Sequence, residues 1–227
     1  MPSRMPDVEL FGHWICPYST RVEFTLHHRA INHQLTEVPP TAVRPTGFVV
    51  PDTFIKHSPR GEIPMIRVGD EHLADSLPIL IWLEDKFTET AMLPVEDEQR
   101  AHVLSRMSEV DALVFPPMIG VYYGIEEESI DASADLLSRG LNTISTWLGD
   151  GWLAGSGLTL VEAVLIPLYV RLEGLRRLGF SHPLPFALDE HRSACEALPA
   201  FDAVRWSAAQ NEEFVRNFEH HRARSRT

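Results

Sequence analysis

A cysteine followed directly by a proline separates a short apolar run from a helix-like segment near the start of the chain. Residues 8–11 are predicted to form a strand, and residues 17–30 a helix in which apolar residues recur every four positions. Proline is favoured at the first position of a helix, because its ring presets φ and its missing N–H needs no partner there. The sulfur of Cys16 is therefore expected at a helix N-terminus.

This position favours thiol chemistry. The unpaired N–H groups and the positive end of the helix dipole stabilise a thiolate relative to a thiol. Such placement lowers the pKa of a cysteine from about 8.5 to below about 7.5, and the thiolate is the nucleophile. The alternative is a small buried hydrophobic residue with no chemical role, which is the commonest use of a lone cysteine. The remainder of the chain decides between these two interpretations.

The composition limits the classes of protein that fit. A chain of 227 residues with 44% hydrophobic and 23% charged residues is typical of a soluble globular protein with two ordinary domains or one large one. Its net charge of −12 argues against nucleic acid as a main partner. Residues 1–7 lack the apolar core of a secretory signal, and no run of about 18 apolar residues predicts a membrane-spanning helix.

The cysteines and histidines give no sign of a disulfide scaffold or a metal site. Cys16 and Cys195 lie far apart in the sequence, and there is no Cys-x-x-Cys motif. The 11 histidines show no metal-binding spacing, and the adjacent pair His27–His28 is expected on a helix surface. No metal is predicted, and a reducing cytoplasm fits the cysteine usage.

The first 87 residues alternate strand and helix signals. After the first helix, residues 34–38 are predicted to form a second strand, and residues 39–51, which carry four prolines and one glycine, an irregular connection. Residues 65–68 and 72–74 are expected to pair as a hairpin around a Gly-Asp turn. Ser76 is then expected to cap a buried helix over residues 77–87. The predicted order is β-α-β, a loop, then β-β-α.

Residues 96–215 show helical periodicity and little strand signal, with a linker predicted over residues 88–95. We therefore expect an α/β domain over residues 1–87 and an all-helical bundle domain over residues 96–227. The local signals predicted within the helical part are a break or kink at Phe115-Pro-Pro117, a capping box at Thr159–Glu162, a kink or early stop at Pro167 and a helix C-cap at Gly179.

Three motifs give the chain a family resemblance. They are Ser58-Pro-Arg-Gly-Glu-Ile-Pro64, Leu73-Ala-Asp-Ser76 with the Leu-Pro-Ile-Leu that follows, and Trp152-Leu-Ala-Gly155 with Thr159-Leu-Val-Glu162. Together with the predicted order of elements, these motifs resemble the glutathione S-transferase superfamily over nearly the whole chain. The resemblance implies a thioredoxin-like N-terminal domain, a C-terminal helical domain, a cytoplasmic homodimer and glutathione as co-substrate, without a metal.

The resemblance also implies a glutathione site. The peptide bond between Ile63 and Pro64 is expected to be cis, with the N–H and C=O of Ile63 facing outward at a strand edge, where a peptide pairs as an added strand. Ser76, at a helix N-terminus, is expected to bind the γ-glutamyl carboxylate, and Asp75 the ammonium group.

Cys16-Pro-Tyr-Ser19 is similar to the cysteine-type members, such as the omega class and monothiol glutaredoxin-like enzymes. In those members the cysteine forms a mixed disulfide with glutathione. Ser19 stands where a dithiol glutaredoxin has its resolving cysteine, so a second glutathione must resolve the intermediate. Glu62 occupies the place of a basic residue that holds the glycyl carboxylate in some members, and Val49-Val50 the place of an expected lysine. Possible substitutes are Lys56, His57 and Arg60.

The family resemblance further implies a pocket for a small aromatic or hydrophobic second substrate between the two domains. The residues expected to line it are Trp14, Phe115, Met118, Tyr122 and Tyr123, although a helix core is the usual place for such residues. An irregular wall at the paired prolines favours exposure of Tyr122 or Tyr123 to this cleft.

We expect a glutathione-dependent thiol transferase or reductase that acts through a mixed disulfide at Cys16. The enzymatic alternative is conjugation of glutathione to small hydrophobic electrophiles. A third possibility is a non-enzymatic binding or regulatory protein. The intracellular chloride channel proteins resemble the family and carry a Cys-Pro-aromatic-Ser motif, but His27-His28-Arg29 in the middle of residues 17–38 argues against membrane insertion there. No nucleic-acid or membrane partner is predicted.

Overall fold

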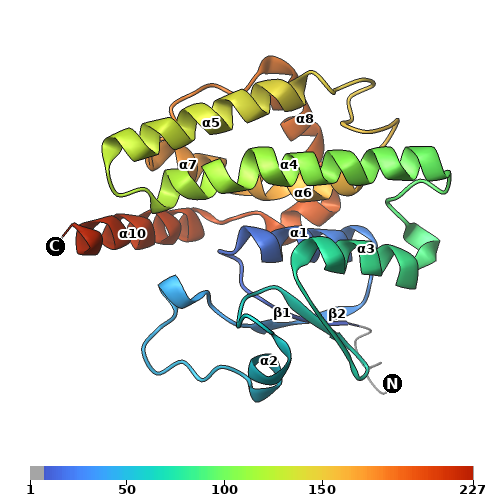
Figure 1. The fold of residues 1–227 in the computed structure, drawn as a ribbon, viewed down its shortest axis with the longest axis horizontal. Helices are drawn as coiled ribbons and strands as arrows, with labels where there is room; N and C mark the ends of the chain where they lie inside the picture. Colours follow the sequence, from blue (N-terminus) through green and yellow to red (C-terminus); the bar gives the residue numbers. More distant parts are fainter. Residues whose placement is uncertain (1–7, 227) are drawn as a thin grey trace. The chain divides into compact units, whose positions relative to one another are not determined.

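The computed structural model describes residues 8–226, which divide into two compact units. The first unit ends at Ala91 and the second begins at Met92. The prediction that the N-terminal seven residues form no secretory signal lies outside the described residues. Figure 1 shows strands in the first unit and helices throughout the second.

The first unit has the predicted β-α-β, β-β-α order with one additional short helix. Its elements are β1 (Val8–Gly12), α1 (Pro17–His28), β2 (His33–Glu37), α2 (Asp52–His57), β3 (Met65–Val68), β4 (Glu71–Ala74) and α3 (Ser76–Lys86), with 3₁₀ turns at Thr41–Val43 and Thr88–Thr90. The predicted strand and helix positions agree to within two residues. The sequence prediction missed α2, because a helix of only six residues between proline-rich loops has too few turns to show a period.

The four strands form one sheet in the order β2-β1-β3-β4. β1 pairs with β2 in parallel, while β3 pairs with β1 and with β4 in antiparallel fashion. Figure 1 shows α1 and α3 on one face of the sheet and α2 on the other. Side chains alternate between the two faces, so Phe11 and Met65 pack against Phe54 of α2 in a buried cluster.

The start of α3 differs from the prediction that Ser76 caps the helix. The N-cap residue is Asp75, which has a φ of 72° and no capping hydrogen bond from its side chain, and Ser76 is the first residue of α3. Ser76 is buried and its hydroxyl accepts a hydrogen bond from Arg21 of α1. The hydroxyl of Ser76 therefore bonds to a residue of another helix, whereas local capping rules predict a bond to a main-chain N–H of α3.

A buried ion pair connects the C-terminal end of α1 to α3. Nη1 of Arg29 lies 2.8 Å from Oε1 of Glu84, and both side chains are fully buried. Arg29 also donates to the carbonyl of Thr90, at 3.0 Å from Nε, and to that of Phe87. A buried charge needs this kind of full pairing, because its loss of hydration would otherwise be very unfavourable. The ends of both helices are therefore fixed by one guanidinium.

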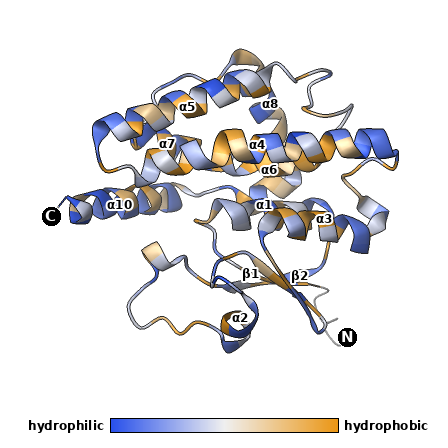
Figure 2. Cartoon of the chain, in the orientation of Figure 1, coloured by the Kyte–Doolittle hydropathy of each residue, from blue (hydrophilic) through white to orange (hydrophobic). Residues whose placement is uncertain are grey.

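The second unit contains seven helices among the residues that the structure describes. They are α4 (Asp97–Tyr123), α5 (Glu127–Ser145), α6 (Leu160–Val170), α7 (Leu172–Arg177), α8 (Phe186–Glu196), α9 (Pro199–Val204) and α10 (Ala208–Ser225). Every residue of α6 is buried, so α6 forms the centre of this unit. Figure 2 shows α10 as largely hydrophilic, with Phe214 and Phe218 among its few buried residues.

Of the break or kink predicted at the paired prolines of the first long helix, the break is wrong. α4 continues through Pro116 and Pro117 to Tyr123. Pro117 has no N–H to donate to the carbonyl of Leu113, four residues earlier. At this carbonyl α5 comes close to α4, since a Cβ built on Gly140 would lie only 2.7 Å from the Leu113 oxygen. Packing between the two helices thus accommodates the irregularity that the sequence alone predicts as a break.

Of the other local signals in the helical unit, two are confirmed and one is corrected. Thr159 and Glu162 form the predicted capping box at the start of α6. Of the kink or early stop predicted at Pro167, the early stop is wrong, because α6 continues to Val170. Gly179 follows the end of α7 with a φ of 121°, and the N–H of Phe180 donates to the carbonyl of Leu175 at 2.9 Å. This pattern is a Schellman C-cap, which requires a left-handed residue at the glycine.

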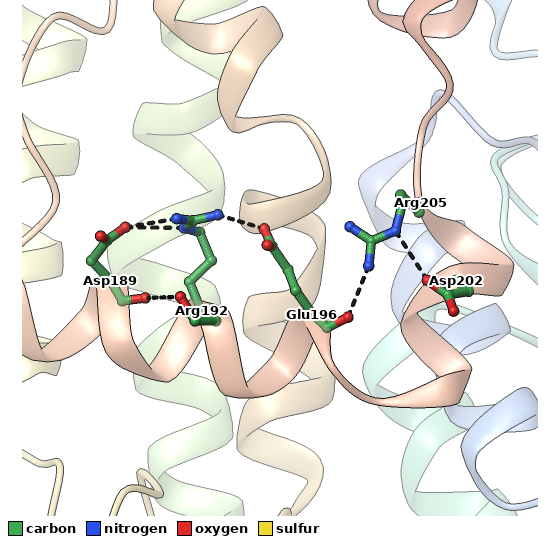
Figure 3. Close-up of polar contacts among 6 residues, drawn as sticks. Asp189, Arg192, Glu196, Asp202 and Arg205 are labelled. Carbon is green, nitrogen blue, oxygen red and sulfur yellow. Dashed lines mark hydrogen bonds and ion pairs between the residues drawn. The ribbon is translucent and has the colours of Figure 1, made fainter.

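Arginines join successive turns on the surface of α8 and α9 (Figure 3). Arg192 pairs with Asp189 at 3.0 Å and with Glu196 at 2.7 Å, along one face of α8. Arg205 pairs with Asp202 at 3.0 Å and donates to the main-chain carbonyl of Glu196 at 2.8 Å. The last contact satisfies a carbonyl at the end of α8, so this network stabilises the turn between the two helices.

None of the helices within residues 8–226 is both long enough and apolar enough to cross a membrane.

Gly140→Ala is expected to destabilise the protein by about 1–3 kcal/mol, because a Cβ at this position overpacks against the Leu113 carbonyl. Alanine favours a helix over glycine by about 1 kcal/mol, so any loss of stability must come from this close contact. Urea denaturation measures the change. Gly149→Ala is the matched control, since a Cβ there meets no atom within 4 Å. Equal stability of the two variants would contradict the packing argument.

Candidate functional site

Cys16 lies at the N-cap of α1, as the Cys-Pro pair predicts. Its φ and ψ are −83° and 119°, Pro17 is the first helical residue, and the carbonyl of Cys16 accepts the N–H of Thr20 at 3.0 Å. The sulfur donates to the main-chain carbonyl of Ile63 at 3.8 Å, within hydrogen-bond range for sulfur. Cys16 is 6% exposed, so only a small part of its surface meets solvent.

The peptide bond between Ile63 and Pro64 is cis, as expected. β3 is an interior strand between β1 and β4, and Ile63 precedes its first residue, Met65. The groups expected to pair with a peptide therefore lie at the end of an inner strand, beside the sulfur of Cys16.

Asp75 is exposed and forms an ion pair with Arg60, and Arg60 also bonds to Glu62 at 2.8 Å. The hydrogen bond that Arg60 donates to Glu62 and the charges of both carboxylates raise the pKa of Arg60. Side chains in this group are half-exposed or more, so the pairs contribute little to stability and can rearrange. Arg60 thus joins the carboxylate of Glu62, next to Ile63 in the sequence, to that of Asp75 at the start of α3.

Arg21 is the residue of this region that sequence reasoning missed. It is almost fully buried in α1, and its Nη2 donates to the hydroxyl of Ser76 at 2.5 Å. Its guanidinium also lies 5.1 Å from the centre of the Tyr18 ring. The sequence carried one signal for it, because a charged residue stands among apolar neighbours on the buried face of α1. The hydroxyl of Ser76, expected to face glutathione, is engaged by this guanidinium.

The structure separates the three basic residues that were considered as substitutes for a missing lysine. Lys56 and His57 line a cavity of about 300 Å³ between α2 and the β3–β4 hairpin, together with Arg67 and His72. The rings of His57 and His72 are nearly parallel, 3.7 Å apart. Arg60, in contrast, bonds directly to Asp75. Arg60 therefore contacts a predicted glutathione-binding residue directly.

The residues expected to line a second-substrate pocket are mostly interior. Phe115 and Met118 of α4 are 1% and 0% exposed. Tyr122 is 3% exposed, and its ring packs against Phe214 and Phe218 of α10. Tyr123 is partly buried and also contacts Phe218. Both tyrosines thus belong to an aromatic cluster within the helical unit.

Trp14 is partly buried in the turn before Cys16, where its ring lies 5.5 Å from that of His13. It is the one predicted pocket residue that belongs to the first unit. Ser19, in the place of a resolving cysteine, is fully buried, and its hydroxyl lies 3.1 Å from the position of a Cβ on Gly12. Ser19 therefore packs between α1 and β1.

Cys195 lies in a different environment from Cys16. It is fully buried in α8, with its sulfur 3.8 Å from Nε2 of His191. Tyr169 hydrogen-bonds to Nδ1 of His191 at 2.8 Å, and Glu162 lies 3.7 Å from Nε2. Burial, with a further contribution from the Glu162 and Glu196 carboxylates, raises the pKa of the Cys195 thiol. This cysteine is held as a neutral thiol inside the helical unit.

Histidine, cysteine and carboxylate side chains between Val8 and Arg226 form no group of three or more that is able to hold a metal ion.

Comparison with known families identifies the first unit. Residues 15–86 match the family model described as "Glutathione S-transferase, N-terminal domain". A wheat (Triticum aestivum) glutathione S-transferase is 28% identical over 170 residues, which cover 70% of this chain and 75% of the wheat protein. A zeta class glutathione S-transferase from Euphorbia esula is 28% identical over 96 residues, 42% of this chain and 41% of that protein.

Solved structures share the fold of the whole chain. Glutathione transferase Omega 3C from Trametes versicolor has a TM-score of 0.79 and 22% identity, covering 96% of this chain and 94% of its own. Rice GST1, solved in complex with glutathione, has a TM-score of 0.81 and 17% identity, covering 98% and 99%. Residues 15–86 therefore belong to the glutathione S-transferase N-terminal domain family, and the relatives and the fold of the whole chain support the glutathione S-transferase superfamily.

Cys16 is expected to titrate below the ordinary thiol pKa of about 8.5, because the helix N-terminus stabilises the thiolate. The pH dependence of alkylation by iodoacetamide, a reagent small enough for a sulfur with little exposed surface, measures this pKa. Cys195 is the internal control and is expected to remain unlabelled in the folded protein, since burial raises its pKa. A pKa of Cys16 at or above that of free cysteine would contradict the prediction.

Proposed function

We propose that this protein is a glutathione-dependent thiol transferase or reductase that works through a mixed disulfide between Cys16 and glutathione. The observation that carries the proposal is the sulfur of Cys16 at the start of α1, 3.8 Å from the Ile63 carbonyl beside the cis proline. A cysteine at this position forms a mixed disulfide by attacking an existing disulfide, whereas a serine or tyrosine only hydrogen-bonds to a thiol.

The proposed reaction has two exchange steps. The Cys16 thiolate attacks the glutathione sulfur of a glutathionylated substrate, the sulfur–sulfur bond breaks, and the substrate leaves as its thiolate. The thiolate of a second glutathione then attacks the mixed disulfide, which releases glutathione disulfide and regenerates the Cys16 thiolate. The substrate gains two electrons, which the two glutathione molecules supply by forming a disulfide. Ser19 offers no second thiol, so glutathione itself completes the cycle.

Several contacts support binding of glutathione next to Cys16. A carbonyl oxygen accepts two hydrogen bonds, so that of Ile63 can accept a peptide N–H as well as the thiol. Asp75 is exposed and offers a carboxylate for the ammonium group. Arg60, held beside it, supplies a cation for a carboxylate of the ligand. The hydroxyl of Ser76 is engaged by Arg21, which leaves the main-chain N–H groups at the start of α3 for the second carboxylate.

Other parts of the proposal derive from the family resemblance. The second substrate is proposed to be small and aromatic or hydrophobic, and to bind in a pocket that includes Trp14 with residues of α4. A homodimer in a reducing cytoplasm is proposed on the same basis.

Conjugation of glutathione to an electrophile is the second candidate function. The relatives favour it, since the wheat and Euphorbia proteins are glutathione S-transferases. The product separates the two candidates, because conjugation yields a thioether and thiol transfer yields glutathione disulfide.

Asp75→Asn is expected to weaken glutathione binding about tenfold, because a charge-assisted hydrogen bond of about 1.5 kcal/mol is lost. Asparagine tolerates the left-handed backbone at this position, so the main chain is retained. Isothermal titration with S-methylglutathione, which cannot form a disulfide, measures the affinity.

Glu62→Gln is the matched control for this variant, since it also removes a carboxylate that pairs with Arg60. It is expected to change the affinity for S-methylglutathione by less than about twofold, because Glu62 does not lie at the start of α3, where the γ-glutamyl group is proposed to bind. Equal affinities in Asp75→Asn and the unmodified protein would exclude Asp75 as the ammonium ligand.

Cys16→Ser is expected to abolish disulfide exchange and leave glutathione binding unchanged. Serine has nearly the shape of cysteine and keeps a side-chain donor but forms no disulfide. Reduction of a glutathionylated peptide, followed by release of glutathione disulfide, measures the exchange. Cys195→Ser is the control and is expected to exchange at the unmodified rate, because Cys195 is fully buried. Exchange that persists in Cys16→Ser would refute the proposed mechanism.

A further inference from the structure

Four residues from His13 to Cys16 connect β1 to α1 in a tight turn. The N–H of Cys16 donates to the carbonyl of His13 at 3.0 Å, which closes the turn. The carbonyl of Cys16 accepts from Thr20 and opens the helix. Both backbone polar groups of Cys16 are therefore used, one by the turn and one by α1, so the geometry of the turn sets where the sulfur lies.

The side chain of His13 folds back onto the same turn. Its Nδ1 lies 3.3 Å from the main-chain nitrogen of Ile15 and accepts that N–H. An amide N–H is always a donor, so Nδ1 carries a lone pair and the proton of the neutral ring is on Nε2. Ile15 is buried with 5% exposure, where an amide that loses its acceptor is costly. His13 thus holds the turn through its main chain and through its ring.

We propose that His13 is a positioning residue for Cys16, whose imidazole Nδ1 keeps the turn in the conformation that places the sulfur at the start of α1 and next to the Ile63 carbonyl. The inference rests on the proposed thiol chemistry of Cys16. His13 acts through the backbone of Ile15 and Cys16, so its role requires no contact between the ring and the reacting sulfur.

Two consequences follow from this arrangement. If the turn opens, Cys16 leaves the N-cap position, and the N–H groups of the first helical turn no longer stabilise its thiolate. The sulfur also loses its fixed distance to Ile63, where the glutathione backbone is proposed to bind. The acceptor atom is the essential feature of the side chain, and the aromatic ring is secondary.

A matched pair of variants separates the acceptor from the ring. His13→Phe keeps a ring that can contact Trp14, as the imidazole does at 5.5 Å, but removes the acceptor. His13→Asn removes the ring but supplies a side-chain oxygen, and asparagine commonly accepts the N–H two residues ahead in an Asx turn. Ile15 is that residue. The proposal therefore predicts a slower reaction of Cys16 in His13→Phe and an unchanged reaction in His13→Asn.

The test measures the rate of Cys16 alkylation by iodoacetamide in the full chain over the pH range from about 5 to 10, which spans the titration of a thiol. In His13→Phe the rate at neutral pH is expected to fall about three- to tenfold, because the loss of one hydrogen bond changes a conformational equilibrium by about that factor. His13→Asn is expected to stay within about twofold of the unmodified protein. Equal rates in all three proteins, or an equal fall in both variants, would overturn the inference.

Two controls keep this result separate from other failures. If the unmodified Cys16 reacts no faster than free cysteine, the proposed function fails, whatever the variants do. If His13→Phe shows no cooperative thermal unfolding, His13→Ala replaces it, and the comparison with His13→Asn is unchanged. A loss of rate in His13→Ala that His13→Asn restores supports the positioning role, and the same rate in both refutes it.

Discussion

The first unit depends on one junction, where the backbone of Cys16 closes the turn after β1 with its N–H and opens α1 with its carbonyl. Because both groups are committed, the sulfur has little freedom, and its contact with the Ile63 carbonyl follows from how β1 and β3 pair. A reactive group built on a sheet and a helix start is held more rigidly than one on a loop. The ordinary secondary structure of this unit thus supplies the geometry for thiol chemistry.

A second junction, at the start of α3, completes the candidate site. Asp75 has a left-handed backbone that turns the chain from β4 into α3 and leaves its carboxylate exposed beside Arg60. Ser76, one residue later, points inward and is engaged by the buried Arg21. Neighbouring residues therefore have different tasks, since one presents a charge to solvent and the other anchors α3 to α1. The same loop can bind a charged ligand and remain firmly attached.

The two cysteines illustrate how environment decides reactivity. Cys16 has a helix N-terminus and a carbonyl acceptor, whereas Cys195 has a histidine, a tyrosine and two carboxylates around a fully buried sulfur. Burial and negative charge both disfavour a thiolate, so the pKa of Cys195 is raised. The network of Glu162, His191 and Tyr169 extends the capping box of α6 into the core, and we assign it a structural role.

The sequence by itself determined the order of elements, the cysteine at the start of α1, the Thr159–Glu162 capping box and the C-cap at Gly179, because each depends on neighbours within a few residues. Only the tertiary structure decided what distant residues do to one another. In the structure the hydroxyl of Ser76 accepts a hydrogen bond from Arg21 and does not cap α3. α4 continues through Pro117, in the region where Gly140 of α5 lies close to the backbone of α4. The tertiary structure also paired Arg60 with Asp75. These contacts join residues 15 to 55 positions apart, and local propensity contains no information about such pairs.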